Sequence, residues 1–136
     1  MKKLLILGLI ALGFASCSKE TLNYAERDAA LNILRANKWM DVVKYVSEEG
    51  KEDTKDTLVG DDETLHLEFR ANNNAYIMNT DQSFSSPIPY SMPEKKVLVF
   101  DGVTYQIQES LIGSITNFSI KNTEAGKTTT IVFKRR

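Results

Sequence analysis

The spacing of apolar residues changes twice along this chain of 136 residues. Residues 4–14 form one uninterrupted apolar run, and Cys17 follows it closely. Between residues 24 and 36, apolar residues recur every three or four positions, which is typical of an amphipathic helix. From Lys38 onward apolar and polar residues alternate, which is typical of half-buried strands. The pattern therefore predicts an apolar leader, one helix and an all-β remainder.

The predicted helix spans residues 24–36 and should pack one side on the domain. That side carries Ala25, Ala29, Ala30, Ile33 and Leu34. Asn23 and Glu26 have the spacing of a capping box, in which each side chain accepts a hydrogen bond from the backbone N–H of the other residue. Asn37 follows and can take the left-handed backbone conformation that ends a helix.

Eight short strands are predicted after the helix. They are residues 38–47, 64–71, 75–80, 87–92, 96–100, 103–108, 114–121 and 127–135. Glu48 to Glu63 is expected to be a long acidic loop. Asp101-Gly102 and a turn around Ala125-Gly126 join hairpins, because these residues tolerate the positive φ of tight turns. The prolines in residues 87–93 cannot donate to a ladder, so the strand there belongs at an edge or a barrel rim.

Short connections after the acidic loop favour antiparallel neighbours, which makes the sheet a meander. An eight-stranded meander either closes on itself or leaves two exposed edges, and closure is the usual solution. The expected fold class is therefore all-β: an eight-stranded antiparallel up-and-down barrel with one N-terminal helix.

The leader has the features of a secretory signal. Lys2 and Lys3 precede an apolar run that is too short to span a bilayer. The sequence Phe14-Ala15-Ser16-Cys17 resembles the lipobox of bacterial lipoproteins, although Leu is typical where Phe14 stands, and it is similar to the aromatic variants of Bacteroidetes-type bacteria. The resemblance implies that residues 1–16 are removed and that Cys17 is acylated, with palmitate as an expected chain. The alternative is an ordinary signal peptide followed by a free thiol.

Cleavage before Cys17 would leave a tether of residues 17–22 and one domain of residues 23–136. Stable anchoring of that domain to a membrane needs two or more acyl chains. Ser18 lacks the acidic charge that tends to retain lipoproteins at the inner membrane in enterobacteria, so the outer membrane is the expected location, with the leaflet left open.

Charge and composition exclude several functions. The mature chain would lose two of its 17 basic residues and keep 18 acidic ones, so no basic stripe is available for nucleic acid. His66 is the sole histidine and is expected at the surface, with no second His or Cys to complete a metal site. The acidic residues of 48–63 lack the spacing of a calcium loop. No nucleophile elbow or phosphate-binding loop appears, so no catalytic residue, metal, cofactor or enzyme activity is expected.

Several features together resemble the compact lipocalin-like lipoproteins of Bacteroidetes. They are a leading helix, Trp39 at the start of the first strand, the Phe69 to Tyr76 hairpin, the Asp101-Gly102 hairpin and a basic final strand. The lipocalin signature would place Gly two residues before Trp39, where this chain has Asn37. The resemblance implies a barrel that binds a small hydrophobic ligand.

In a closed meander the last strand runs antiparallel beside the first, so Arg135 should lie near Trp39. A guanidinium over an indole contributes about 0.5 to 2 kcal/mol, and the pair would resemble the closed end of lipocalin barrels. Alternatively, Trp39 is simply a core residue and Arg135 is solvated.

The interior of an eight-stranded barrel is either filled or holds one small ligand, and two hypotheses follow. In the first, the barrel is open near Pro87 to Pro93 and carries a small hydrophobic ligand. The pocket would be lined by Tyr76, Met78, Tyr90, Met92, Tyr105 and Phe118. In the second, the barrel is filled and acts as an interaction module for an envelope protein partner, with an exposed apolar patch.

Overall fold

The computed structural model describes residues 21–112 and 116–135. Residues 21–36 form a helix, and strands follow it to the end of the described chain. The strands are β1 (Trp39–Glu48), β2 (Thr54–Val59), β3 (His66–Phe69), β4 (Asn74–Met78), β5 (Ile88–Glu94), β6 (Val97–Phe100), β7 (Val103–Ile107), β8 (Asn117–Glu124) and β9 (Lys127–Arg135). Each strand from β3 to β8 pairs antiparallel with the next one along the chain.

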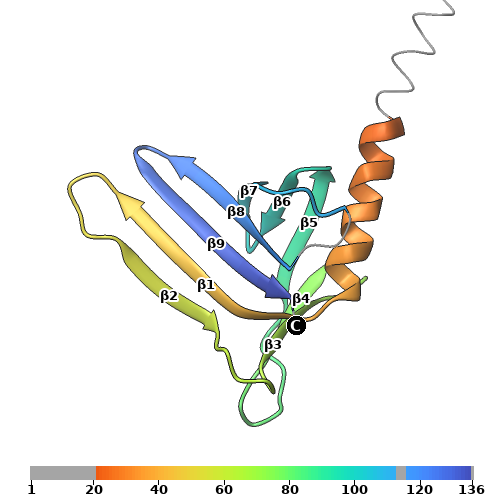
Figure 1. Cartoon of the computed structure of the whole chain (residues 1–136), viewed down its shortest axis with the longest axis horizontal. Helices are drawn as coiled ribbons and strands as arrows, with labels where there is room; N and C mark the ends of the chain where they lie inside the picture. Colours follow the sequence, from red (N-terminus) through yellow and green to blue (C-terminus); the bar gives the residue numbers. More distant parts are fainter. Residues whose placement is uncertain (1–20, 113–115, 136) are drawn as a thin grey trace, which may run out of the picture.

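The sheet closes where β9 pairs antiparallel with β1, from Trp39↔Arg135 to Glu48↔Lys127. On the other side of β1, β3 pairs opposite Trp39 and β2 pairs opposite residues 42–46. Because β2 and β3 follow one another along the same side of β1, they occupy one place in the barrel. The predicted fold, a closed eight-stranded antiparallel barrel with one N-terminal helix, is confirmed (Figure 1).

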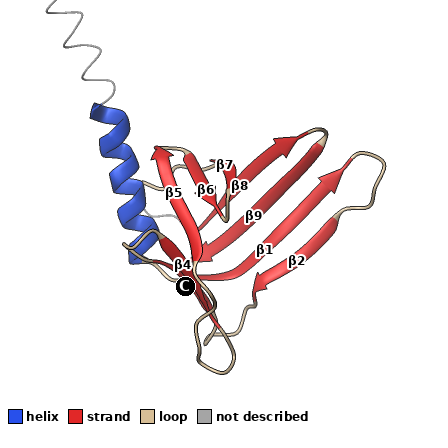
Figure 2. Ribbon diagram, turned by 180° about the vertical axis from the view of Figure 1, so that it is seen from behind, coloured by secondary structure: helices blue, strands red, loops and turns tan. Residues whose placement is uncertain are grey.

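The prediction that residues 48–63 form one long acidic loop is wrong, because the middle of this segment forms β2. Residues 54–57 are all exposed, so this strand is stabilised by its backbone ladder with β1 and buries almost no side chains. A strand of that kind leaves no apolar alternation in the sequence. In Figures 1 and 2, β2 lies beside β1, β8 and β9 on the side of the molecule away from the helix.

The barrel interior is filled by aromatic rings from strands all around the sheet. Trp39 and Phe118 meet edge to face at 4.7 Å between ring centroids, and Phe118 stacks on Phe133 at 4.6 Å. Phe69 lies 6.0 Å from Phe133 and 4.9 Å from Tyr90. Each of these side chains is at most 3% exposed. Rings at such distances leave no room for a ligand between them.

The helix is joined to the barrel by side chains at both of its ends. Asn23 does not form the predicted capping box, because the chain is already helical at residue 21; instead its Oδ1 accepts a hydrogen bond from Lys95 N at 3.2 Å. At the other end of the helix, Asn37 does not take the left-handed backbone conformation that the sequence predicts. Its Nδ2 donates to Ile33 O at 2.7 Å, and Trp39 Nε1 donates to Leu34 O at 3.0 Å. These side chains satisfy the last helical carbonyls without a glycine-type turn.

The predicted hairpin turns are confirmed by their backbone conformations. Asp101 and Gly102 have φ of 53° and 81°, and Ala125 and Gly126 have φ of 49° and 77°. Positive φ at both central residues is the signature of a tight hairpin turn whose twist matches the strands. β8 therefore continues to Glu124, beyond the predicted end of that strand.

The proline-containing strand β5 is not an edge strand, because it pairs with β4 on one side and with β6 on the other. It pairs with β4 only at Asn74↔Pro89 and Ala75↔Ile88. Pro89 has no N–H to donate to the ladder. The helix runs beside this part of the sheet, next to β5, as Figure 2 shows.

Candidate functional site

Four of the predicted pocket residues lie in the core instead of around a cavity. Tyr90, Met92, Tyr105 and Phe118 are each at most 5% exposed and belong to the same packed cluster. Tyr90 also bonds outward, because its hydroxyl donates to Arg70 O and accepts from Arg35 Nε at 2.8 Å. Burial and the charge of Asp101 raise the pKa of the Tyr105 hydroxyl.

The other two predicted pocket residues, Tyr76 and Met78, lie on the outer face of the barrel. β3 and β4 pair with Phe69 opposite Ala75 and with Leu67 opposite Ile77. Directly opposed residues share a face, and Leu67, Phe69 and Ala75 are all buried. The prediction that Tyr76 and Met78 face the interior is therefore wrong by one residue, because the residue of β4 that points inward, Ala75, is small.

Tyr76 belongs to a cluster on that outer face. The guanidinium of Arg70 lies between two rings, 4.3 Å from the centroid of Tyr76 and 4.6 Å from that of Phe84. Arg70 Nε donates to Glu68 Oε2 at 3.3 Å, and Glu68 Oε1 lies 3.3 Å from His66 Nε2. Burial alone would raise the pKa of the Glu68 carboxyl, but the hydrogen bonds from Arg70 and His66 outweigh it and lower the pKa.

The expectation that His66 lies at the surface is wrong. It does point away from Leu67 and Phe69, but it is only 5% exposed because Phe84 covers it, with the ring centroids 6.2 Å apart. Within the described residues, His66 Nδ1 has no hydrogen-bond partner. This histidine is a covered part of the outer cluster, which we define as His66, Glu68, Arg70, Tyr76 and Phe84.

Trp39 and Arg135 are direct cross-strand partners, as barrel closure predicts. Trp39 is fully buried and packs edge to face on both Phe118 and Phe133. Its indole therefore acts as a core residue that also ties the helix to the barrel through Leu34 O. Arg135 is exposed at the end of β9.

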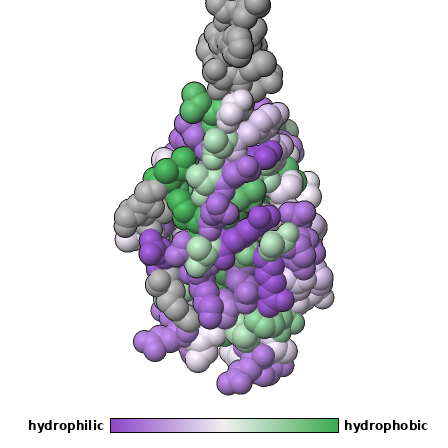
Figure 3. Space-filling model, turned by 90° about the vertical axis from the view of Figure 1, so that its right-hand side faces the viewer, coloured by the Kyte–Doolittle hydropathy of each residue, from purple (hydrophilic) through white to green (hydrophobic). Residues whose placement is uncertain are grey.

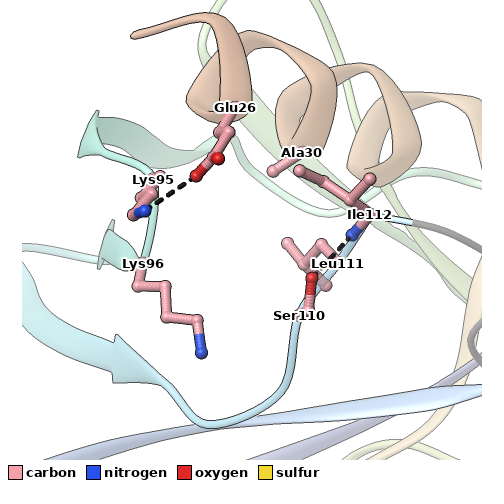
Figure 4. Close-up of a pocket in the computed structure, with 7 residues that line it drawn as sticks. All are labelled: Glu26, Ala30, Lys95, Lys96, Ser110, Leu111 and Ile112. Carbon is pink, nitrogen blue, oxygen red and sulfur yellow. Dashed lines mark hydrogen bonds and ion pairs between the residues drawn. The ribbon is translucent and has the colours of Figure 1, made fainter. Parts of the chain in front are cut away.

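A pocket of about 230 Å³ lies between the helix and the barrel (Figure 4). We call it the helix pocket, and its lining residues are Glu26, Ala30, Lys95, Lys96, Ser110, Leu111 and Ile112. Ala30 and Leu111 are buried and give it an apolar floor, and Ile112 is 48% exposed at its side. The residues come from the helix, the β5–β6 turn and the segment after β7.

The charged groups of the helix pocket are not equivalent. Lys95 Nζ forms an ion pair with Glu26 Oε2 at 2.8 Å, which fixes the β5–β6 turn to the helix. Within residues 21–112 and 116–135, no carboxylate lies within ion-pair distance of Lys96. Figure 4 shows the Lys96 side chain extending into the space between the β5–β6 turn and the 110–112 segment. The pocket therefore offers one available cation beside an apolar floor.

A second, smaller pocket of about 160 Å³ lies where β2 and β4 end. Its lining is mostly aliphatic and contains no charged side chain. The lining residues are Leu58, Val59, Gly60, Leu65, Ile77, Met78, Asn79 and Thr80. Met78 is the predicted pocket residue that lines it.

The helix pocket was missed because its residues are far apart in the sequence. Each segment looks ordinary by itself: a helix face, a lysine pair in a turn and a short connection. The one local signal was Leu111-Ile112, an apolar pair in a stretch predicted to be a connection. Apolar residues in a connection are unusual unless something covers them.

Cys17, the proposed signal of residues 1–16 and the first residues of the tether lie outside the described residues. Among the described side chains, no three His, Cys, Asp or Glu residues gather as a metal site would require. The described part of the chain also contains no helix with the length and apolar character needed to cross a membrane.

Comparison with known proteins does not identify a family for this chain. No protein-family model matches the chain, and a search of curated proteins finds no match either.

Proposed function

We propose that this chain is a lipoprotein of the bacterial outer membrane, anchored through acylated Cys17, that binds a small amphiphilic acid in the helix pocket. The lipobox resemblance of Phe14-Ala15-Ser16-Cys17 supports the anchor. The helix pocket, which combines an apolar floor with the available ammonium of Lys96, supports the ligand class and is the observation that carries the proposal.

The proposed site lies outside the barrel because the interior is occupied. Trp39, Phe118 and Phe133 contact one another across the core at centroid distances of 4.6 to 6.5 Å. Opening a cavity there would require these rings to separate and to lose their packing contacts with one another. A ligand that binds beside the helix avoids that cost.

The size and charge of the helix pocket define the ligand. Its volume of about 230 Å³ is below the roughly 300–1,000 Å³ of most small-molecule sites, so the ligand should be small. Ala30 and Leu111 would contact an apolar chain, and Lys96 would donate a charge-assisted hydrogen bond to an anionic head group. A medium-chain fatty carboxylate has this combination.

Isothermal titration with decanoate and decanol tests the proposal. We expect the chain to bind decanoate more tightly than decanol, because only the carboxylate pairs with Lys96. A hydrogen bond to a charged group contributes about 1.5 to 3 kcal/mol, so Lys96→Gln should weaken decanoate binding about tenfold or more. Binding of decanol should change little in this variant.

Lys127→Gln is the matched control, because Lys127 is exposed at the start of β9 in the long strands that extend away from the helix. It should bind decanoate as the unmodified chain does. An equal loss in both variants would mean that decanoate responds only to net charge, and no binding at all would refute the ligand proposal.

The filled interior favours a second candidate, an interaction module for an envelope protein partner. Native mass spectrometry of the protein purified gently from its own host distinguishes the two. A small molecule retained in stoichiometric amount supports the carrier, whereas a bare mass together with a protein retained in stoichiometric amount supports the module.

A further inference from the structure

Exposed apolar side chains lie on the first turn of the helix and beside its middle, next to Ala30. Leu22 is 61% exposed and Tyr24 49% exposed, both in the first described turn, and Ile112 is 48% exposed. Ile112 lies beside Glu26 in the helix pocket, and Glu26 is one turn after Leu22 on the same side of the helix. In Figure 3, hydrophobic surface follows this side of the helix toward its first turn.

Two lysines lie beside these apolar residues. Lys95 is held to the helix by its contacts with Asn23 and Glu26, and Lys96 follows it in the same turn. We call this set the anchor end and define it as Leu22, Tyr24, Lys95, Lys96 and Ile112. It combines aliphatic, tyrosine and lysine side chains, which is the composition of surfaces that lie in the interface of a bilayer.

The covalent distance to Cys17 is short. Four steps from one Cα to the next lead from Cys17 to residue 21, and a fully extended chain advances at most about 3.6 Å per step. Residue 21, where the described helix begins, therefore lies within about 14 Å of the Cys17 backbone. An acylated Cys17 lies at the membrane surface, so the anchor end lies near that surface as well.

We propose that the anchor end rests on an anionic bilayer surface and gives the domain a fixed orientation. Leu22 and Ile112 enter the interface, and the ring of Tyr24 lies at the level of the head groups. The positive charge of Lys95, which is fixed beside the helix by Glu26, attracts anionic lipid, while Lys96 stays in the helix pocket for the carboxylate of the ligand. This inference rests on the acylation of Cys17 that the proposed function includes. In this orientation the helix pocket opens at the level of the lipid head groups, where an amphiphilic acid can enter from the bilayer.

Site-specific quenching tests the orientation in the lipidated full chain. The protein is reconstituted into vesicles of equimolar phosphatidylethanolamine and phosphatidylglycerol, with and without brominated acyl chains. Because acylation consumes the Cys17 thiol, a fluorescent label attaches only to an introduced cysteine. Leu22→Cys and Ile112→Cys probe the anchor end. Phe84→Cys is the control, since Phe84 is 40% exposed in the β4–β5 loop at the opposite end of the molecule (Figure 1).

We expect bromine quenching at positions 22 and 112 to be several-fold stronger than at position 84. Equal quenching at all three positions, or none at positions 22 and 112, would overturn the orientation. The intact mass of each protein reports acylation separately. An unmodified Cys17 would refute the anchor in the proposed function and this orientation with it, whereas an acylated chain with equal quenching refutes the orientation alone.

Discussion

Glu68 is the central residue of the outer cluster, because it joins a buried histidine to an arginine held between two rings. Its carboxylate contacts His66 Nε2 and Arg70 Nε, both at 3.3 Å. Arg70 in turn holds Phe84 through its ring face, so the cluster fastens the β4–β5 loop to the barrel. The lowered pKa of Glu68 means that the ionised form is the one the folded chain stabilises.

Glu68→Gln should lower the free energy of unfolding at neutral pH, since the amide lacks the charge that Arg70 pairs with. The pKa of Glu68 is lower in the folded than in the unfolded chain, so its contribution is complete above the ordinary glutamate pKa and is lost as pH falls through the folded-state value. Urea unfolding of both proteins at several pH values measures this. We expect the difference between them to shrink between about pH 5 and pH 3.

Thr123→Val is a useful comparison, because Thr123 Oγ1 lies 3.3 Å from Thr128 Oγ1, a hydroxyl pair that includes no carboxylate. Its effect on stability should not follow the Glu68 profile. If the difference between the chain and Glu68→Gln stays constant down to pH 3, then the ionised carboxylate of Glu68 does not stabilise the fold.

Among the elements, the β6–β7 hairpin depends most clearly on local backbone chemistry. Gly102 has φ of 81°, and a Cβ added there would meet no atom within 4 Å. A substitution therefore costs backbone strain alone. Gly60 differs from Gly102 because its φ is not positive, so a side chain there causes no backbone strain. A Cβ added at Gly60 would lie 3.4 Å from Leu65 Cδ1, which is an ordinary contact distance.

Gly102→Ala should lower the free energy of unfolding by about 1 to 2 kcal/mol, which is the cost of a left-handed backbone for a residue with a Cβ. Thermal unfolding with calorimetry measures it. Gly60→Ala should have a smaller effect or stabilise the chain, because alanine reduces the conformational freedom of the unfolded state. A greater loss for Gly60→Ala than for Gly102→Ala would contradict this account of the hairpin.

The sequence predicted those elements whose signals are local. Asp101-Gly102 and Ala125-Gly126 mark their turns by residue type, and alternation located most of the strands. The sequence does not predict β2, because most of its side chains are exposed and show no apolar alternation. The strand is identified only by its backbone pairing with β1. The face of β4 was misassigned because Ala75, which points inward, is smaller than its outward neighbours Tyr76 and Met78.

At the scale of the whole molecule, barrel closure could be inferred from the meander, and the state of the interior could not. The same alternating residues describe an empty and a filled barrel. Only the distances between Trp39, Phe118 and Phe133 show that the interior is filled. The helix pocket depends on how three separate segments meet, which no local pattern specifies.

The central claim is that a ligand binds beside the helix and outside a filled barrel. Methyl NMR during a decanoate titration tests it most directly, because both regions carry methyl groups. We expect the signals of Ala30, Leu111 and Ile112 to shift with a single saturating curve. The signals of the core residues Leu98, Ile120 and Ile131, each at most 2% exposed, should stay in place. Shifts confined to these core methyls would place the ligand inside the barrel and contradict the account.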